Sequence, residues 1–131
     1  MKRYAVSALG LVMFSVALVA QTPPVTGDRS SPLRPLGGDN VGISNAVMRE
    51  QPEVRVLRVV VEPGGTRVIH AHSGVRFHLF VPISGPMEVN LDGGRSVQVR
   101  PWHPYYLREG DRHGFHNSGS VAVEVMEIFI R

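Results

Sequence analysis

Hydrophobic and polar residues alternate along the second half of the chain, which is the pattern of half-buried β-strands. The alternation predicts a strand that starts at Glu53, a turn at Glu62-Pro63-Gly64-Gly65, and further strands over 66–71, 76–83 and 121–130. No segment past residue 50 carries an apolar stripe at helical spacing long enough for a helix. Short strands at this spacing predict an all-β sandwich or barrel.

The clearest local signal in the chain is a hairpin. Residues 87–91 and 95–100 both alternate, and Asp92-Gly93-Gly94 joins them. An Asp-Gly pair between two alternating runs favours a tight hairpin turn.

The N-terminus has the layout of a secretory signal peptide, residues 1–20. A basic start, Met1-Lys2-Arg3, precedes an apolar stretch that ends at Ala20 and breaks into Gln21-Thr22-Pro23-Pro24. Cleavage after Ala20 would leave a periplasmic or secreted protein with no stable membrane anchor. An uncleaved anchor and a buried core helix are the alternatives.

Residues 21–44 contain four prolines and four glycines. Such a stretch is unsuited to helix or ladder pairing, so it is predicted to be an extended arm or linker. The folded domain is then expected over residues 45–131.

Length, cysteine content and charge exclude several classes of protein. The chain has 131 residues, enough for one domain, and no cysteine, which excludes disulfide frameworks and thiol chemistry. Past residue 20, twelve scattered arginines face eleven acidic residues, so no basic stripe for a nucleic acid is visible. The chain has no nucleophile-elbow, phosphate-loop or dinucleotide motif.

All six histidines fall between residues 70 and 116. His70 and His72 are two residues apart, so on a strand they project from one face, and the next strand can bring His78 beside them. His113 follows the turn at 109–112. Imidazoles that close on one point bind transition metals, whereas isolated histidines are more often packed or surface residues.

The glycine spacing around these histidines resembles that of the cupins. Gly64 is followed after five residues by His70-Ala71-His72, then by His78 after five more and Gly85 after six. A second motif has Gly110, then His113 after two intervening residues, and Asn117 after three more. The resemblance covers about residues 53–131 and implies a double-stranded β-helix barrel.

The resemblance also implies one divalent transition metal, Fe, Mn, Zn, Ni or Cu, at His70, His72, His78 and His113. His78 stands where the family usually has Glu, with one extra residue after His72, so a site of only His70, His72 and His113 is the alternative. Trp102 and Arg108 replace the Gly and Pro of the second motif, changes expected to affect turns only.

Neutral ligands leave a divalent ion its full charge, so we expect an anionic substrate. Arg76, if it faces inward beside His78, would anchor the anion, and Tyr106 or its neighbour Tyr105 would act as general acid or hydrogen-bond donor. A solvated arginine and packed aromatic side chains are the alternatives. His116 should point away from His113, and Asn117 should tie down the turn.

Two classes of function follow from the resemblance. One is an exported metal-dependent enzyme, of oxygenase, lyase or isomerase type, acting on a small anionic organic molecule. The other is a non-catalytic cupin module that binds a small ligand or metal. Cupins often dimerise by strand exchange, and the arm at 21–50 could join two copies in this way.

Overall fold

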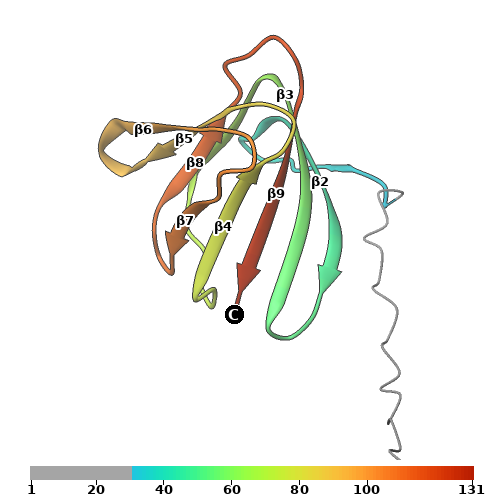
Figure 1. Ribbon diagram of the computed structural model, residues 1–131, viewed down its shortest axis with the longest axis vertical. Coiled ribbons are helices and arrows are strands. Elements are labelled where there is room, and N and C mark those ends of the chain that lie inside the picture. The colour runs from blue at the N-terminus through green and yellow to red at the C-terminus, as the bar shows by residue number, and fades with distance from the viewer. Residues whose placement is uncertain (1–30) are drawn as a thin grey trace, which may run out of the picture.

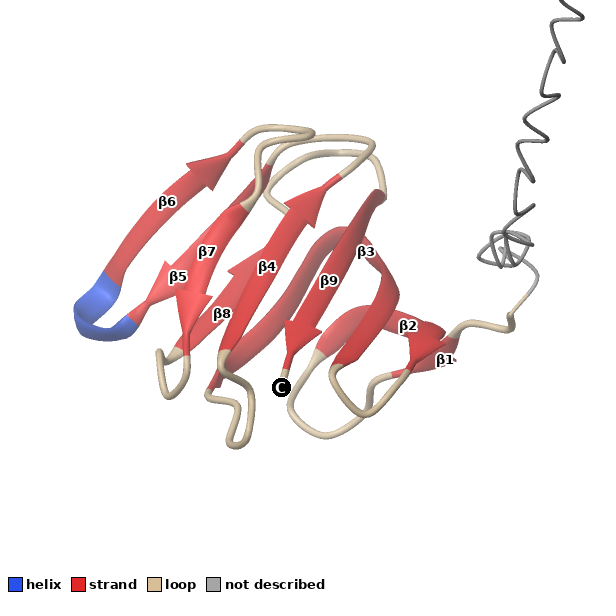
Figure 2. Cartoon of the chain, turned by 60° about the horizontal axis from the view of Figure 1, so that its bottom comes forward, coloured by secondary structure: helices blue, strands red, loops and turns tan. Residues whose placement is uncertain are grey.

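The computed structural model describes residues 31–131, so the predicted signal peptide and the start of the predicted linker lie outside the described residues. Within this range nine strands curl into a nearly closed barrel, with one short 3-10 helix, Asp92–Gly94, and no helix long and apolar enough to cross a membrane (Figures 1 and 2). The strands are β1 (Arg34–Pro35), β2 (Val41–Glu50), β3 (Val54–His70), β4 (Phe77–Pro82), β5 (Met87–Leu91), β6 (Arg95–Val99), β7 (Tyr105–Arg108), β8 (His113–His116) and β9 (Val123–Ile130).

β3 is one bent strand of 17 residues and belongs to both walls of the barrel. Its first part, Val54–Val61, pairs antiparallel with β9, and its last part, from Thr66, pairs with β8. The predicted turn at 62–65 is therefore wrong. At Gly65 a Cβ atom would collide with backbone oxygens of Glu62 and Gly42, and the missing side chain lets the strand bend there without ending.

The two walls share β3 and face each other across the core. One wall runs β2-β3-β9-β4-β7, and the other runs β3-β8-β5-β6. β9 alternates strictly between buried and half-buried positions, as its sequence predicted. The core side chains are hydrophobic and contribute about 1.5–3 kcal/mol each when fully buried; the largest are Phe80, Phe115, Met87, Val59, Val61, Val89 and Val125.

β1 and β2 correct the expectation for the predicted linker. Residues 34–35 pair with residues 44–45, and β2 pairs along β3 from Val41 to Glu50, so β2 crosses the expected boundary at residue 44. The Asn40 side chain closes the intervening turn by donating to the Gly37 carbonyl at 2.7 Å, and Leu36 packs against the core. The expectation that 21–44 takes no part in a ladder is wrong for these residues.

The β5–β6 hairpin is confirmed in full register, from Met87 opposite Val99 to Leu91 opposite Arg95. β7 was not predicted, because Tyr105–Arg108 follows a Pro-rich loop that masks its short alternation. It pairs with β4, with Tyr105 opposite Phe80 and Arg108 opposite Phe77.

Candidate metal centre

Four histidines gather inside one end of the barrel. His70 ends β3, His72 lies in the loop that follows, His78 lies in β4, and His113 begins β8. The ring centroids of His70 lie 4.7 Å from His72 and 4.6 Å from His113. Ligand nitrogens of His70, His72 and His113 all lie within 4.8 Å of one another. These three residues form what we call the histidine triad.

A β-bulge aims His70 into the barrel. His70 pairs with His113 and Arg67 with Phe115, so β3 uses three residues where β8 uses two. The extra residue lets Arg67 and His70 share the inner face, although their odd separation would place them on opposite faces of a regular strand. Gly114 lies against this bulge, where a Cβ atom would collide with the Arg67 carbonyl oxygen.

Backbone carbonyls set the tautomers of two triad members. The Nδ1 atoms of His70 and His113 lie 3.0 Å and 2.9 Å from the carbonyl oxygens of Val68 and Asp111. Because a carbonyl only accepts, each Nδ1 carries the proton and donates it, which leaves the Nε2 lone pair available for a metal. The Nε2 of His113 is buried and has no hydrogen-bond partner within residues 31–131.

The distances in the triad also fit a metal. The Nε2 atoms of His70 and His72 lie 3.1 Å apart. Two nitrogens that each bind one ion at about 2.1 Å, at roughly right angles, are separated by about 3 Å. The residues present therefore fit a bound divalent transition metal.

Burial keeps the triad neutral at pH 7. Loss of solvent, followed by repulsion from the neighbouring imidazoles, lowers the pKa of His72 to about 4. Burial is also the largest cause that lowers the pKa of His113 to about 4 and that of His70 below its usual value. Neutral imidazole is the form that binds metals.

His78 adjoins the triad but directs its ring elsewhere. Its ring centroid lies 5.3 Å from His72 and 5.1 Å from His113, and it stacks on Phe129 at 4.4 Å. Its Nε2 lies 3.3 Å from Oε1 of Glu127, although not in hydrogen-bond geometry. The structure thus brings together three of the four predicted ligands, and a ligand role for His78 stays a prediction.

Glu127 is a site residue that the sequence analysis did not identify. It is buried in β9 between Val125 and Phe129, facing His78. Burial alone would raise the pKa of Glu127, but His78, with His72 and His113 behind it, outweighs burial and lowers that pKa. The available signal was a carboxylate on the otherwise apolar face of Val123, Val125 and Phe129.

A cavity of about 420 Å³ lies beside the triad between the two walls. Its lining comes from β2, β3, β8, β9 and the loop after β3: Leu36, Ile43, Asn45, Arg55, Leu57, Val59, Arg67, His70, His72, Ser73, Gly74, Val75, Phe115, Glu127, Phe129 and Arg131. Three arginines and one carboxylate thus line a cavity whose histidines are neutral.

Arg67 is the arginine of the lining that has no acidic partner. Its Nη1 donates to Oδ1 of Asn40 at 2.9 Å, and no carboxylate of residues 31–131 lies within 4.0 Å of its guanidinium. Burial lowers the pKa of Arg67, against the opposing effect of Glu127, but an arginine stays charged at pH 7. Its remaining N–H donors can bind an anion.

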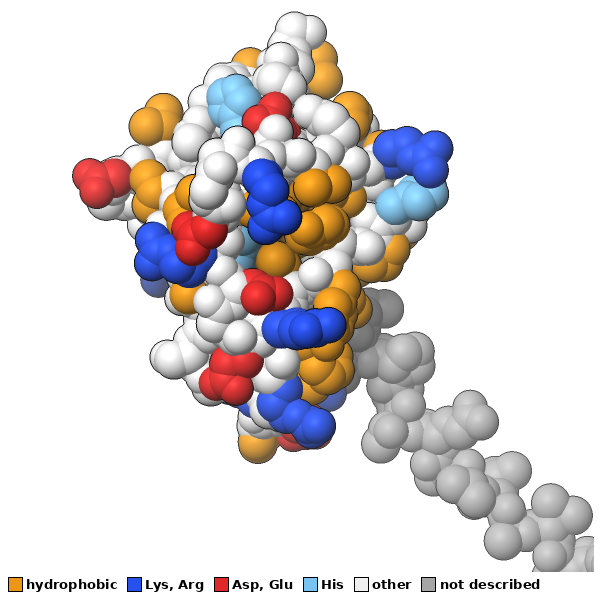
Figure 3. Space-filling view, turned by 90° about the vertical axis from the view of Figure 1, so that its left-hand side faces the viewer, with side chains coloured by type: hydrophobic (Ala, Val, Ile, Leu, Met, Phe, Trp, Pro, Cys, Tyr) orange, Lys and Arg blue, Asp and Glu red, His pale blue; other side chains and the backbone are white. Residues whose placement is uncertain are grey.

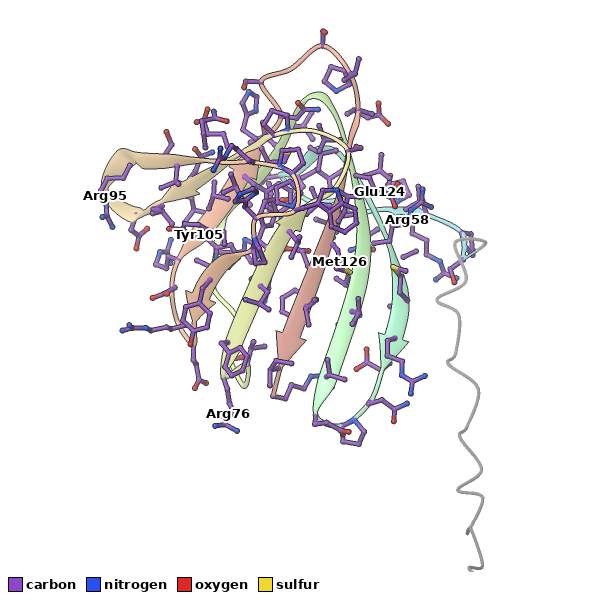
Figure 4. The ribbon with its side chains drawn as sticks, in the orientation of Figure 1. Arg58, Arg76, Arg95, Tyr105, Glu124 and Met126 are labelled. Carbon is purple, nitrogen blue, oxygen red and sulfur yellow. The ribbon has the colours of Figure 1, made fainter. Side chains whose placement is uncertain are left out.

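The two predicted catalytic residues lie outside the cavity. Arg76 precedes β4, is exposed, and points away from the barrel in Figure 4, so it does not share the inner face of His78. Strand alternation did not apply to Arg76 because β4 begins only at Phe77. Tyr106 is 53% exposed and packs on Phe77 outside the barrel, while its neighbour Tyr105 packs against the core.

The remaining candidates lie largely as expected. His116 lies on the opposite face from the triad, with its Nδ1 2.9 Å from Oγ1 of Thr66. Asn117 donates to the carbonyls of Val61 and Val121, at 3.0 and 2.8 Å, which confirms that it ties down its turn. On the face seen in Figure 3, arginine side chains are interspersed with acidic and hydrophobic ones.

Comparisons with known proteins identify the fold. Neither a family model nor a curated protein matches the sequence. Among solved structures, the polyketide cyclase RemF from Streptomyces resistomycificus has a TM-score of 0.67 at 18% identity, over 77% of this chain and 74% of that chain. An RmlC-like cupin from Shewanella frigidimarina has a TM-score of 0.64 at 16% identity, over 77% and 84%. A cupin domain from Bordetella pertussis has a TM-score of 0.60 at 26% identity, over 72% and 99%. The chain has the cupin fold, the RmlC-like jelly roll.

Proposed function

We propose that this protein is an exported, metal-binding cupin that acts on a small anionic organic molecule, by chemistry of the oxygenase, lyase or isomerase type. The observation that carries the proposal is the histidine triad beside a cavity that His70, His72 and Arg67 line, with no carboxylate of the described residues in ion-pair distance of Arg67. The last part of β3 thus carries both a candidate metal ligand, His70, and a positive charge, Arg67, that suits an anion.

The histidine triad would hold the ion, because its ligand nitrogens lie close together. The Nδ1–H groups of His70 and His113 donate to backbone carbonyls, which leaves their Nε2 atoms free for the ion. A bound divalent ion supplies a Lewis acid or a redox centre. Arg67 would bind the carboxylate of the substrate and orient it toward the triad, since a guanidinium pairs with a carboxylate through two parallel N–H donors. The apolar side chains of the lining, which include Phe115 and Phe129, would pack against the carbon skeleton of the bound molecule.

Export rests on the sequence of residues 1–24, with its basic start, apolar stretch and polar break. A periplasmic or secreted location follows from it. A homodimer stays a prediction. The arm expected to join two copies spans 21–50, and its described part contains β1 and β2.

A non-catalytic binding module is the second candidate. It is favoured by the positions of Arg76 and Tyr106, since neither predicted catalytic side chain enters the cavity. Glu127 is the one carboxylate of the described lining, and it faces His78.

One experiment separates the two candidates. The protein, purified without a histidine tag, is loaded with Fe, Mn, Zn, Ni or Cu and incubated with a panel of small organic acids. Oxygen consumption and product formation are followed together with thermal stability. Turnover of one acid supports the enzyme, and stabilisation without turnover supports the binding module. A protein that shows neither contradicts both.

A further inference from the structure

Two further arginines line the same cavity at its rim, and both are held by one acidic residue. Arg55 lies near the start of β3 and Arg131 follows β9. The Glu50 carboxylate, at the end of β2, lies 3.0 Å from Nε of Arg55 and 2.6 Å from Nη2 of Arg131. Arg131 is fixed to this corner by its backbone N–H, which donates to the Glu53 carbonyl at 3.0 Å.

These ion pairs are of the kind that contributes little to stability. The side chains of Arg55 and Glu50 are 43% and 47% exposed, and that of Arg131 is 35% exposed. Exposed pairs are screened by water, so a carboxylate from a ligand could replace Glu50 at small cost. The Nε of Arg55 is buried and has no hydrogen bond of good geometry within the described residues, so the internal pairing is also incomplete.

The charges of the rim favour an anion even while Glu50 is in place. Two guanidiniums share one carboxylate, which leaves one positive side-chain charge unbalanced at the rim. Arg67 adds a further positive charge in the same cavity, on the second half of β3, where Glu127 offsets it only from beyond ion-pair distance. One anionic group on the ligand can satisfy only one of these two places.

We propose that Arg55 and Arg131 form a second anion-binding subsite, which Glu50 occupies in the free protein, and that the ligand is therefore a small dicarboxylate. One carboxylate binds at Arg67 beside the triad, and the other displaces Glu50 at the rim. This inference rests on the proposed function for the Arg67 end, whereas the rim subsite itself needs no metal.

The test compares unbranched dicarboxylates of four to six carbons with monocarboxylates of the same length, by calorimetry on metal-loaded and metal-stripped protein. We expect a dicarboxylate of suitable length to bind about tenfold or more tightly than its monocarboxylate. R55Q and R131Q should each remove most of this preference. E50Q should strengthen dicarboxylate binding, because it removes the internal competitor.

R49Q is the matched control, since Arg49 is exposed in the same hairpin and does not line the cavity. It should leave the preference unchanged. Equal affinity for mono- and dicarboxylates at every length, or a preference that survives R131Q and R55Q, overturns the inference. Metal content is measured on the same samples. A protein that holds no metal but prefers dicarboxylates contradicts the proposed function alone, and a metal-loaded protein without the preference contradicts the rim subsite alone.

Discussion

His70 and His113 are register partners on β3 and β8, with ring centroids 4.6 Å apart, because β3 carries one extra residue between Arg67 and His70. Without that bulge, either Arg67 or His70 would face outward. The same backbone irregularity therefore places the proposed metal ligand His70 and the proposed anion-binding residue Arg67 in one cavity.

Gly114 is expected to be essential for this arrangement. In G114A the new methyl group collides with backbone atoms of the bulge. Backbone atoms cannot rotate aside as the end of a flexible side chain could. We expect a loss of about 1–3 kcal/mol in the free energy of unfolding, measured in urea, together with weaker metal binding. H116A is the control, because His116 lies on the outer face of the same strand. Equal metal affinity in G114A and the wild type would show that the bulge does not position His70.

Arg67, and not Arg76, is expected to bind the anionic group. R67Q should weaken the binding of a small organic acid about tenfold or more while the metal content stays near that of the wild type. R76Q should bind like the wild type, because Arg76 is exposed and outside the cavity. Calorimetry on both variants measures the difference, and the opposite ranking would restore the sequence-based role of Arg76.

Glu127 should matter for stability far more than its neighbour on the strand. E127Q replaces the carboxylate that faces the buried His78, and losing one partner of a buried polar pair costs about 1–3 kcal/mol. Glu124 lies on the outer face of β9, 2.9 Å from Nε of Arg58, with a side chain that is 25% exposed (Figure 4). E124Q should cost about 1 kcal/mol or less. Urea unfolding at pH 7 gives both values, and equal costs would argue against a stabilising His78–Glu127 pair.

The metal-free protein should lose stability as the pH falls from about 6.5 to about 4. The pKa of His72 and that of His113 are lowered to about 4 in the folded state, against an ordinary value of 6.5. In this window the unfolded chain takes up protons that the folded protein does not, so unfolding becomes easier with acid, and above pH 7 the effect is absent. The lowered pKa of Glu127 adds a further loss in the same direction below its ordinary value of 4.5.

Urea midpoints measured across pH 4–7.5 in the presence of a chelator test this expectation. H113N should flatten the pH dependence, and H103N should leave it unchanged, because His103 is exposed. A midpoint that stays constant from pH 7 to pH 4 would show that the triad titrates normally.

Strand alternation correctly predicted the regular strands, in which one face stays toward the core along the whole length. β9 and the β5–β6 hairpin are of this kind. It failed where the backbone departs from a regular strand. β3 bends at Gly65 instead of turning, and β4 begins one residue after Arg76.

In the site, too, regular spacing was predictable from the sequence and the effects of backbone irregularities were not. The histidine spacing and the cupin resemblance together predicted that His70, His72 and His113 meet, either with His78 or without it, and the three do meet. They could not predict that Arg67 joins them, because the bulge depends on the pairing of β3 with β8 and leaves no mark in the local sequence. Glu127 was visible as an acid on an apolar face, and its partner His78 becomes clear only when β4 and β9 pair.

The most direct measurement is the metal content of the untagged protein after reconstitution, by mass spectrometry, with H70A, H113A and H78A alongside. We predict about one divalent transition metal per chain in the wild type, and its loss in H70A and in H113A. Loss in H78A as well would add His78 to the ligand set, whereas retention would define a three-histidine site. No bound metal in the wild type with iron, manganese, zinc, nickel or copper, or full retention in both H70A and H113A, would contradict a metal centre at the triad.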